Sequence, residues 1–123
     1  MERYRIVIAD DHSMMRHGLR RIIEENAGLE VIGEAGDGLE LLELLKTVVP
    51  DLVILDMSMP KLRGIDAINE IKMRYPGVKV LVLSMHKEYL CRALAAGVAG
   101  YLLKEDAERE LFSSIEYIRQ GKI

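Results

Sequence analysis

The chain has 123 residues, half of them hydrophobic and 30% of them charged, and its formal net charge is −3. This length fits one domain with a core of its own, and the composition excludes an intrinsically disordered chain. The mildly negative charge offers no basic field to a phosphate backbone, so we expect no nucleic-acid contact by this chain alone.

The cysteine content and the length of the apolar runs narrow the possible binding sites and the cellular location of the protein. The single cysteine, Cys91, excludes an internal disulfide and a multi-cysteine zinc site, and its apolar neighbours predict a buried position. No apolar stretch approaches the length of a membrane span, and the N-terminal run turns acidic too early for a secretory signal. We therefore expect a cytoplasmic protein without membrane contact.

Five short apolar runs recur along the chain and predict five strands. They are RIVIA (5–9), EVIGEA (30–35), DLVILD (51–56), VKVLVLS (78–84) and GYLLK (100–104). The runs are almost continuously hydrophobic rather than alternating, which is typical of parallel strands buried on both faces of a sheet. The run at 30–35, which ends at Glu34 and Ala35, is equivocal and would lie to one side if it is an edge strand.

The segments between and after these runs have helical periodicity. Their apolar stripes are Met15, Leu19, Ile22 and Ile23; Leu41, Leu42, Leu45 and Val48; Ile65, Ile68 and Ile71; Leu90, Ala93 and Leu94; and Leu111, Ile115 and Ile118. Helix ends are marked by Gly28, Gly97, Gly121 and, slightly beyond two other helices, Pro50 and Pro76. Strict alternation with right-handed crossovers predicts an α/β doubly wound domain, a parallel sheet covered by helices on both faces.

Polar side chains follow four of the five predicted strands directly. Asp10 and Asp11 end the first, Asp56 the third, Ser84 the fourth and Lys104 the fifth. Ligands of open parallel sheets bind beyond the carboxyl ends of the strands, where the strand order reverses. These five side chains are therefore expected to meet at one rim.

Each of these residues also has a simpler interpretation when it is taken alone. Asp10 and Asp11 are suited to cap the following helix, Asp56 to lie in a loop, and Lys104 to remain solvated. The combination of these residues argues against the separate interpretations. Independent loops rarely place only carboxylate, hydroxyl and ammonium groups at the same end of four strands.

The charges of this set indicate its chemistry. Two carboxylates about 4 Å apart repel by about 4 kcal/mol at an effective dielectric near 20, so three together need a cation. Oxygen ligands favour Mg²⁺. A carboxylate nucleophile, a metal ion, an ammonium and a hydroxyl together suit the transfer of a phosphoryl group.

At these residues the sequence resembles a known family. The segments IADDH, LVILDMSMPKLRGIDAI, VLVLSMH and AGVAGYLLKED resemble the receiver domain of bacterial two-component response regulators, and the similarity runs from about Arg5 to Gly121. The sequences of these segments most resemble the NarL/FixJ subfamily, whose receivers precede a LuxR-type helix-turn-helix domain. The resemblance implies a flavodoxin-like (βα)5 fold with strand order 2-1-3-4-5.

The resemblance also implies individual roles. Asp56 would be the phosphoacceptor, and Asp10, Asp11, Asp56 and the backbone carbonyl of Ser58 would hold Mg²⁺. Lys104 and Ser84 would contact the phosphoryl group. Tyr101 would swing inward behind Ser84 and change the face made by the fourth helix, fifth strand and fifth helix; alternatively, it is simply a packed aromatic residue.

Several positions depart from the broad family pattern. Met85 and His86 follow Ser84 where many receivers have a small residue, so Met85 is predicted to narrow access to Asp56. Glu105 follows Lys104 where many receivers have a cis-proline, and the geometry of that bond stays open. The three histidines, His12, His17 and His86, lack the spacing of a metal site and are assigned to the surface or the pocket rim.

The leading functional hypothesis is a signalling receiver, not an enzyme, that autocatalyses only its own phosphorylation and dephosphorylation. Residues 1–123 would form the receiver, and a C-terminal DNA-binding effector domain would lie outside this chain. A sensor histidine kinase is the expected donor, and a phosphorylation-dependent homodimer is possible within this hypothesis. The alternatives are a stand-alone receiver acting through protein contacts and an aspartate-nucleophile phosphatase. A dinucleotide-binding site at GEAGDG (33–38) is rejected because its glycine spacing is wrong.

Overall fold

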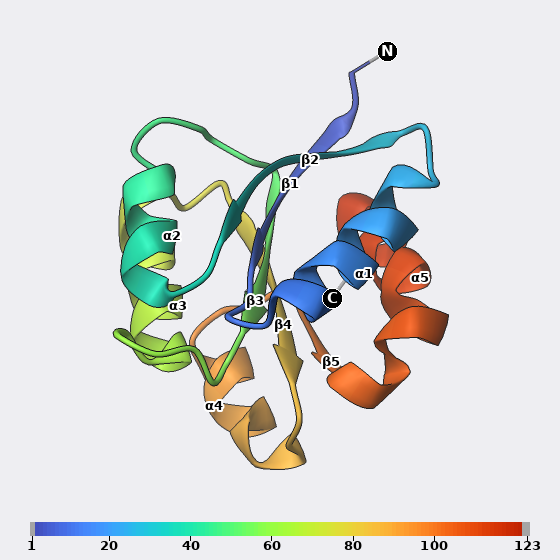
Figure 1. The fold of residues 1–123 in the computed structure, drawn as a ribbon. Helices are drawn as coiled ribbons and strands as arrows, with labels where there is room; N and C mark the ends of the chain where they lie inside the picture. The colour runs from blue at the N-terminus through green and yellow to red at the C-terminus, as the bar shows by residue number, and fades with distance from the viewer. Residues whose placement is uncertain (1, 122–123) are drawn as a thin grey trace.

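The computed structural model describes residues 2–121 and alternates strands with helices along the whole of that range (Figure 1). The strands are β1 (Tyr4–Ala9), β2 (Leu29–Ala35), β3 (Leu52–Asp56), β4 (Lys79–Ser84) and β5 (Gly100–Leu103). The α-helices are α1 (Ser13–Glu24), α2 (Gly38–Leu44), α3 (Gly64–Arg74), α4 (Leu90–Ala95) and α5 (Ala107–Arg119). Short 3₁₀ helices, η1 (Lys87–Tyr89) and η2 (Lys104–Asp106), precede α4 and α5. The predicted alternation is confirmed.

The strands form one parallel sheet in the order β2-β1-β3-β4-β5. This is the strand order implied by the family resemblance, and it makes β2 an edge strand. The order reverses between β1 and β3, which pair directly with Ile6 opposite Leu52 and Ala9 opposite Leu55. The carboxyl ends of β1 and β3 therefore lie side by side at the point where ligands bind in such sheets.

Alternate strand residues supply two separate cores, one on each face of the sheet. Ile6, Ile8, Leu52 and Ile54 pack with α1 and α5, whereas Val7, Ala9, Val53 and Leu55 pack with α2, α3 and α4. Figure 1 shows this three-layer arrangement, with α1 and α5 on one side of the sheet and the remaining helices on the other. Because both faces are covered, the strands are almost continuously apolar, as the sequence suggested.

Helix α4 departs from the prediction. Its stripe was expected to bury Leu90, Ala93 and Leu94, and Cys91 was expected to be buried, but only Ala93 is buried and Cys91 is exposed. A six-residue helix makes fewer than two turns and presents one position to the sheet. Cys91 lies two residues before Ala93, which is roughly 200° around the helix axis, so it faces away from the core.

The backbone answers one open question, the geometry of the Lys104–Glu105 bond, and tests the predicted glycine helix ends. The Lys104–Glu105 bond is trans, as are the other peptide bonds among residues 2–121. Gly97 and Gly121, which follow α4 and α5, have φ values of 95° and 84°, the left-handed conformation in which glycine ends a helix without steric cost.

Within the described range, the helices are all too short or too polar to cross a membrane.

Gly38 provides a test of how tightly the loop after β3 is packed. A methyl group added there would lie 2.5 Å from Cβ of Leu62 and 3.0 Å from its carbonyl oxygen, so the loop would have to move. We expect Gly38→Ala to lower the free energy of unfolding by about 2 kcal/mol, measured by urea denaturation. Gly18→Ala is the matched control, because Gly18 is exposed on α1 and a methyl group there meets no described atom within 4 Å outside its own helix backbone. This substitution should stabilise the helix by about 1 kcal/mol. Equal effects of the two substitutions would contradict the packing argument.

Candidate functional site

The carboxyl ends of four strands place Asp10, Asp56, Ser84 and Lys104 at one rim of the sheet. Asp10 and Asp56 are each 1% exposed, and Ser84 is also buried. Burial of a charged side chain is costly unless it is paired, so the buried carboxylates of Asp10 and Asp56 need a cationic partner. The predicted convergence of Asp10, Asp56 and Lys104 is confirmed by direct contacts. Asp11 joins the same acidic group, and Ser84 ends the neighbouring strand β4.

Lys104 lies between the two buried carboxylates. Its Nζ atom is 3.2 Å from Oδ2 of Asp10 and 3.2 Å from Oδ2 of Asp56, and its side chain is 9% exposed. Both Oδ2 atoms are fully buried, yet neither accepts a well-aligned hydrogen bond from the described residues. The ammonium therefore offsets the negative charge without satisfying these oxygens, which leaves them able to bind a further cation.

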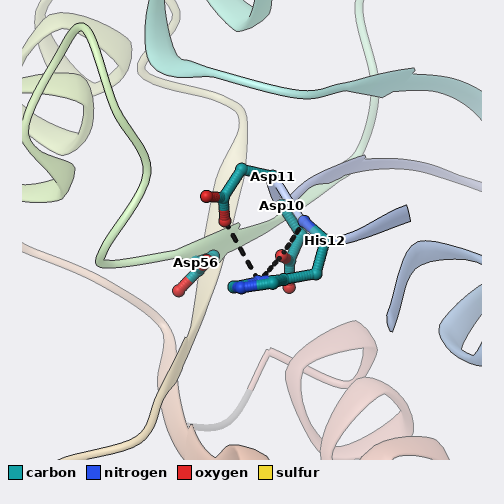
Figure 2. A group of neighbouring side chains, drawn as sticks. All are labelled: Asp10, Asp11, His12 and Asp56. Carbon is teal, nitrogen blue, oxygen red and sulfur yellow. Dashed lines mark hydrogen bonds and ion pairs between the residues drawn. The ribbon is translucent and has the colours of Figure 1, made fainter. Parts of the chain in front are cut away.

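The loop after β1 turns Asp10 inward and keeps Asp11 at the rim. Oδ1 of Asp10 accepts a hydrogen bond from the backbone N–H of His12 at 2.9 Å and contacts the Nδ1 atom of His12 at 3.0 Å. Oδ1 of Asp11 lies 3.1 Å from the same Nδ1 atom (Figure 2). The N-cap residue of α1 is His12, without a side-chain cap, so the helix-capping interpretation of the aspartates is wrong.

Asp56 ends β3 with its carboxylate held by the next loop. Its Oδ1 atom accepts hydrogen bonds from the backbone N–H of Ser58 at 3.2 Å and from the Ser58 hydroxyl at 3.1 Å. The resemblance assigned only the carbonyl of Ser58 to the site, so the hydroxyl contact is an addition from the structure. The other oxygen, Oδ2, faces Lys104.

The acidic residues have the chemistry and spacing of a cation site. Asp10, Asp11, His12 and Asp56 each offer one ligand atom, and these atoms lie within 4.8 Å of one another. Two carboxylate oxygens in this cluster, Oδ2 of Asp10 and Oδ2 of Asp56, are buried and accept no hydrogen bond from residues 2–121. Oxygen-rich clusters of this kind suit hard divalent cations. The sequence analysis assigned His12 to the surface or the pocket rim, and it lies at this rim with its side chain 62% exposed beside Asp10 and Asp11.

A second group of contacts links Ser84 to Tyr101. The Ser84 hydroxyl accepts a hydrogen bond from the backbone N–H of His86 at 3.0 Å, and the Tyr101 hydroxyl donates to the His86 carbonyl at 2.6 Å. Tyr101 is half-buried against the core on the α3 and α4 side of the sheet. Met85 and His86 are exposed beside Ser84. One short loop therefore connects the buried hydroxyl to the aromatic ring.

An ionic network behind Asp10 was missed by the sequence analysis. Arg16 donates to the backbone carbonyl of Asp10 and, at 3.1 Å, to Glu34 at the end of β2, and Arg20 also donates to Glu34. These contacts tie α1 to the edge strand and to the loop that carries Asp10. The spacing of Arg16 and Arg20, four residues apart on one helix, was the available signal.

This network predicts a contribution of Glu34 to stability that depends on pH. Burial acts to raise the pKa of Glu34, but hydrogen bonds and charges from Arg20 and Arg16 outweigh it and lower the pKa below its ordinary value of 4.5. A lowered carboxyl pKa contributes stability that is present above the unfolded value and lost as pH falls through the folded value. Glu34→Gln should therefore lose less stability than the wild type between about pH 6 and pH 3 in urea denaturation. The control is Glu43→Gln, which changes an exposed side chain on α2 and should follow the wild type; identical curves for all three proteins would contradict the prediction.

Known proteins resemble this chain in sequence and in fold. The response regulator receiver domain family matches residues 6–116. The chain is 40% identical over 118 residues to the transcriptional regulatory protein DegU of Brevibacillus brevis, an alignment that covers 94% of this chain and 50% of DegU. The chain thus spans about half the length of the curated relatives it matches.

Two solved structures extend the similarity to the whole fold. The receiver domain of the putative response regulator NarL from Mycobacterium tuberculosis has a TM-score of 0.92 at 32% identity, covering 99% of this chain and 100% of that one. A LuxR-family two-component response regulator from Aurantimonas sp. SI85-9A1 has a TM-score of 0.92 at 34% identity, covering 98% and 88%. Of these three relatives, DegU is a transcriptional regulatory protein, and the other two are response regulators. The chain belongs to the response regulator receiver domain family, and it is a receiver domain of the LuxR-family, NarL/FixJ type.

Proposed function

We propose that this receiver domain accepts a phosphoryl group on Asp56 in the presence of Mg²⁺ and passes the resulting conformational change to an effector. The observation that carries the proposal is the position of Lys104, whose ammonium lies 3.2 Å from both Asp10 and Asp56 in a buried pocket. Such a pocket holds a carboxylate nucleophile beside a fixed positive charge, away from bulk water, where electrostatic stabilisation of a transferred phosphoryl group is strong.

The donor in this proposal is a phosphohistidine on a sensor histidine kinase. An oxygen of Asp56 attacks phosphorus, the phosphorus–nitrogen bond to the donor imidazole breaks, and the imidazole leaves with the bonding electron pair. Lys104 faces the carboxylate that gains the phosphoryl group, and Ser84, whose oxygen already accepts from His86, retains its own hydroxyl proton to donate. Mg²⁺, held by Asp10, Asp11, Asp56 and the Ser58 carbonyl, would neutralise charge on the phosphoryl oxygens.

The proposed switch runs through the loop between Ser84 and Tyr101. If Ser84 turns towards the phosphoryl group, its hydrogen bond from His86 is lost, and His86 is the residue to which Tyr101 donates. Phosphorylation then biases two arrangements of this loop and of the adjoining α4-β5-α5 face, because it stabilises one of them preferentially. That face exposes Leu90 and Leu94 of α4, which suits a homodimer or an effector contact formed after phosphorylation.

The proposed domain organisation is a receiver over residues 1–123 followed, in the full protein, by a helix-turn-helix DNA-binding domain. The half-length match to regulators such as DegU supports it. A stand-alone receiver that acts through protein contacts is the alternative. In a gel-shift assay the chain alone should leave a promoter fragment unshifted; a specific shift would show that this chain itself contacts DNA and would overturn the proposed division.

The proposal is tested by incubating the protein with acetyl phosphate and Mg²⁺ and measuring the intact mass. One phosphoryl group should be added, borohydride reduction and peptide mapping should locate it on Asp56, and EDTA should prevent the reaction. Addition of beryllofluoride and Mg²⁺ should shift the NMR signals of Ser84, Tyr101 and α4. No incorporation, or incorporation at another residue, would refute the proposal. Steady release of many phosphates per protein from a phosphomonoester would instead indicate a phosphatase.

A further inference from the structure

We infer that His12 gives the acidic pocket a nitrogen ligand, so that the site takes a first-row transition metal ion such as Mn²⁺, Co²⁺ or Ni²⁺ through an imidazole as well as through carboxylates. The inference rests on the proposed function, because it concerns the same cation site, and it goes beyond it by adding a residue and a class of metal.

The position of the ring carries the inference. The Nδ1 atom of His12 is 3.0 Å from Oδ1 of Asp10 and 3.1 Å from Oδ1 of Asp11. Asp56 completes the group, and the four ligand atoms all lie within 4.8 Å of one another. Opposite ligands of an octahedral ion are about 4.2 Å apart when each bond is about 2.1 Å, so only small movements would bring all four atoms into contact with one ion. Figure 2 shows the ring beside all three carboxylates.

A second observation identifies the pocket as a ligand site rather than a surface cluster. Oδ2 of Asp10 and Oδ2 of Asp56 are buried within it and accept no hydrogen bond from the described residues. Each carboxylate is 1% exposed. A cation bound here would add to the ion pairs that Lys104 makes with both Oδ2 atoms at 3.2 Å, whereas His12 contacts the other oxygen, Oδ1, of Asp10.

The Nδ1 atom of the His12 ring can become a ligand when its lone pair is free. In the arrangement seen here, the Nδ1 atom lies between two carboxylate oxygens, which requires that it carry the proton. Metal binding needs the Nδ1 lone pair, so a proton on Nδ1 must leave that atom when the ion binds. The His12 side chain is 62% exposed, and water can accept this proton.

A nitrogen ligand changes which ions the pocket favours. Imidazole suits the later divalent first-row metals, whereas carboxylate, carbonyl and water suffice for Mg²⁺. His12 should therefore add affinity for Ni²⁺ and Co²⁺ and leave the affinity for Mg²⁺ almost unchanged. His12 is thus proposed as a selectivity residue of the cation site.

Tag-free protein loaded with Mn²⁺ provides the direct test. Electron spin echo modulation should show coupling to a directly bound ¹⁴N nucleus in the wild type. The coupling should vanish in His12→Gln and persist in His17→Gln and His86→Gln, which remove the two other exposed histidines. In calorimetric titrations His12→Gln should bind Ni²⁺ and Co²⁺ about tenfold more weakly or worse and bind Mg²⁺ within about twofold of the wild type.

The outcomes separate this inference from the proposed function. Absence of ¹⁴N coupling in the wild type, its persistence in His12→Gln, or an equal loss of Mg²⁺ and Ni²⁺ affinity would overturn the role of His12. If the same protein were still phosphorylated on Asp56 by acetyl phosphate and Mg²⁺, the proposed function would stand. Coupling lost only in His12→Gln would support the inference, even in a protein that fails to be phosphorylated.

Discussion

Asp56→Asn should take up no phosphoryl group from acetyl phosphate and Mg²⁺ under conditions in which the wild type is fully labelled. The amide is neutral and a poor nucleophile, and Asp10, the other buried carboxylate, is held by His12 and Lys104. Its Mg²⁺ affinity, measured by calorimetry, should fall at least about tenfold because one of three carboxylates is lost.

The stability of this variant should separate a chemical role of Asp56 from a structural one. Removing one carboxylate relieves repulsion among the acidic residues, and Lys104 keeps its contact with Asp10 at 3.2 Å. We therefore expect the free energy of unfolding without Mg²⁺ to change by less than about 1 kcal/mol. The control is Asp51→Asn, at the opposite end of β3, where the carboxylate accepts from the backbone N–H of Arg5; it should label like the wild type. Labelling of Asp56→Asn at the wild-type rate would refute the phosphoacceptor assignment.

Lys104→Met should have the second-largest effect, and it should affect both stability and phosphorylation. The substitution leaves Asp10 and Asp56 buried together without a positive charge between them. Loss of one member of a buried ionic group costs about 3 kcal/mol, because the remaining charges stay desolvated. Urea denaturation without metal should show this loss.

Mg²⁺ should restore part of the stability of Lys104→Met, because a ligand that binds only the folded state stabilises it by mass action. Labelling by acetyl phosphate should nevertheless remain slow, since the ammonium that faces the phosphoryl group is missing. Lys46→Met, which removes an exposed ion pair with Glu43, is the control and should change stability by less than about 1 kcal/mol. A Lys104→Met protein with wild-type stability and labelling would show that Lys104 is not part of the site.

The fold and most of the candidate site could be predicted because they depend on local patterns repeated along the chain. Continuous apolar runs such as Leu52–Asp56 indicated buried parallel strands, and each carboxyl end then fixed the position of the next polar residue. Asp10, Asp11, Asp56, Ser84 and Lys104 were therefore expected at one rim, and they lie at the carboxyl ends of their strands.

Only the tertiary structure could decide contacts between side chains from different elements. It turned Nδ1 of His12 onto Asp10 and Asp11, placed Arg16 behind the loop of Asp10, and tied Tyr101 to the His86 carbonyl. It also corrected Cys91, because the length of α4 and its rotation on the sheet determine which side chains are buried. Periodicity and strand ends are properties of neighbouring residues, so the sequence by itself determined the layers of the fold and the rim at the strand ends. Rotamers, helix rotation and loop contacts depend on packing between distant segments. These features were decided only by the tertiary structure.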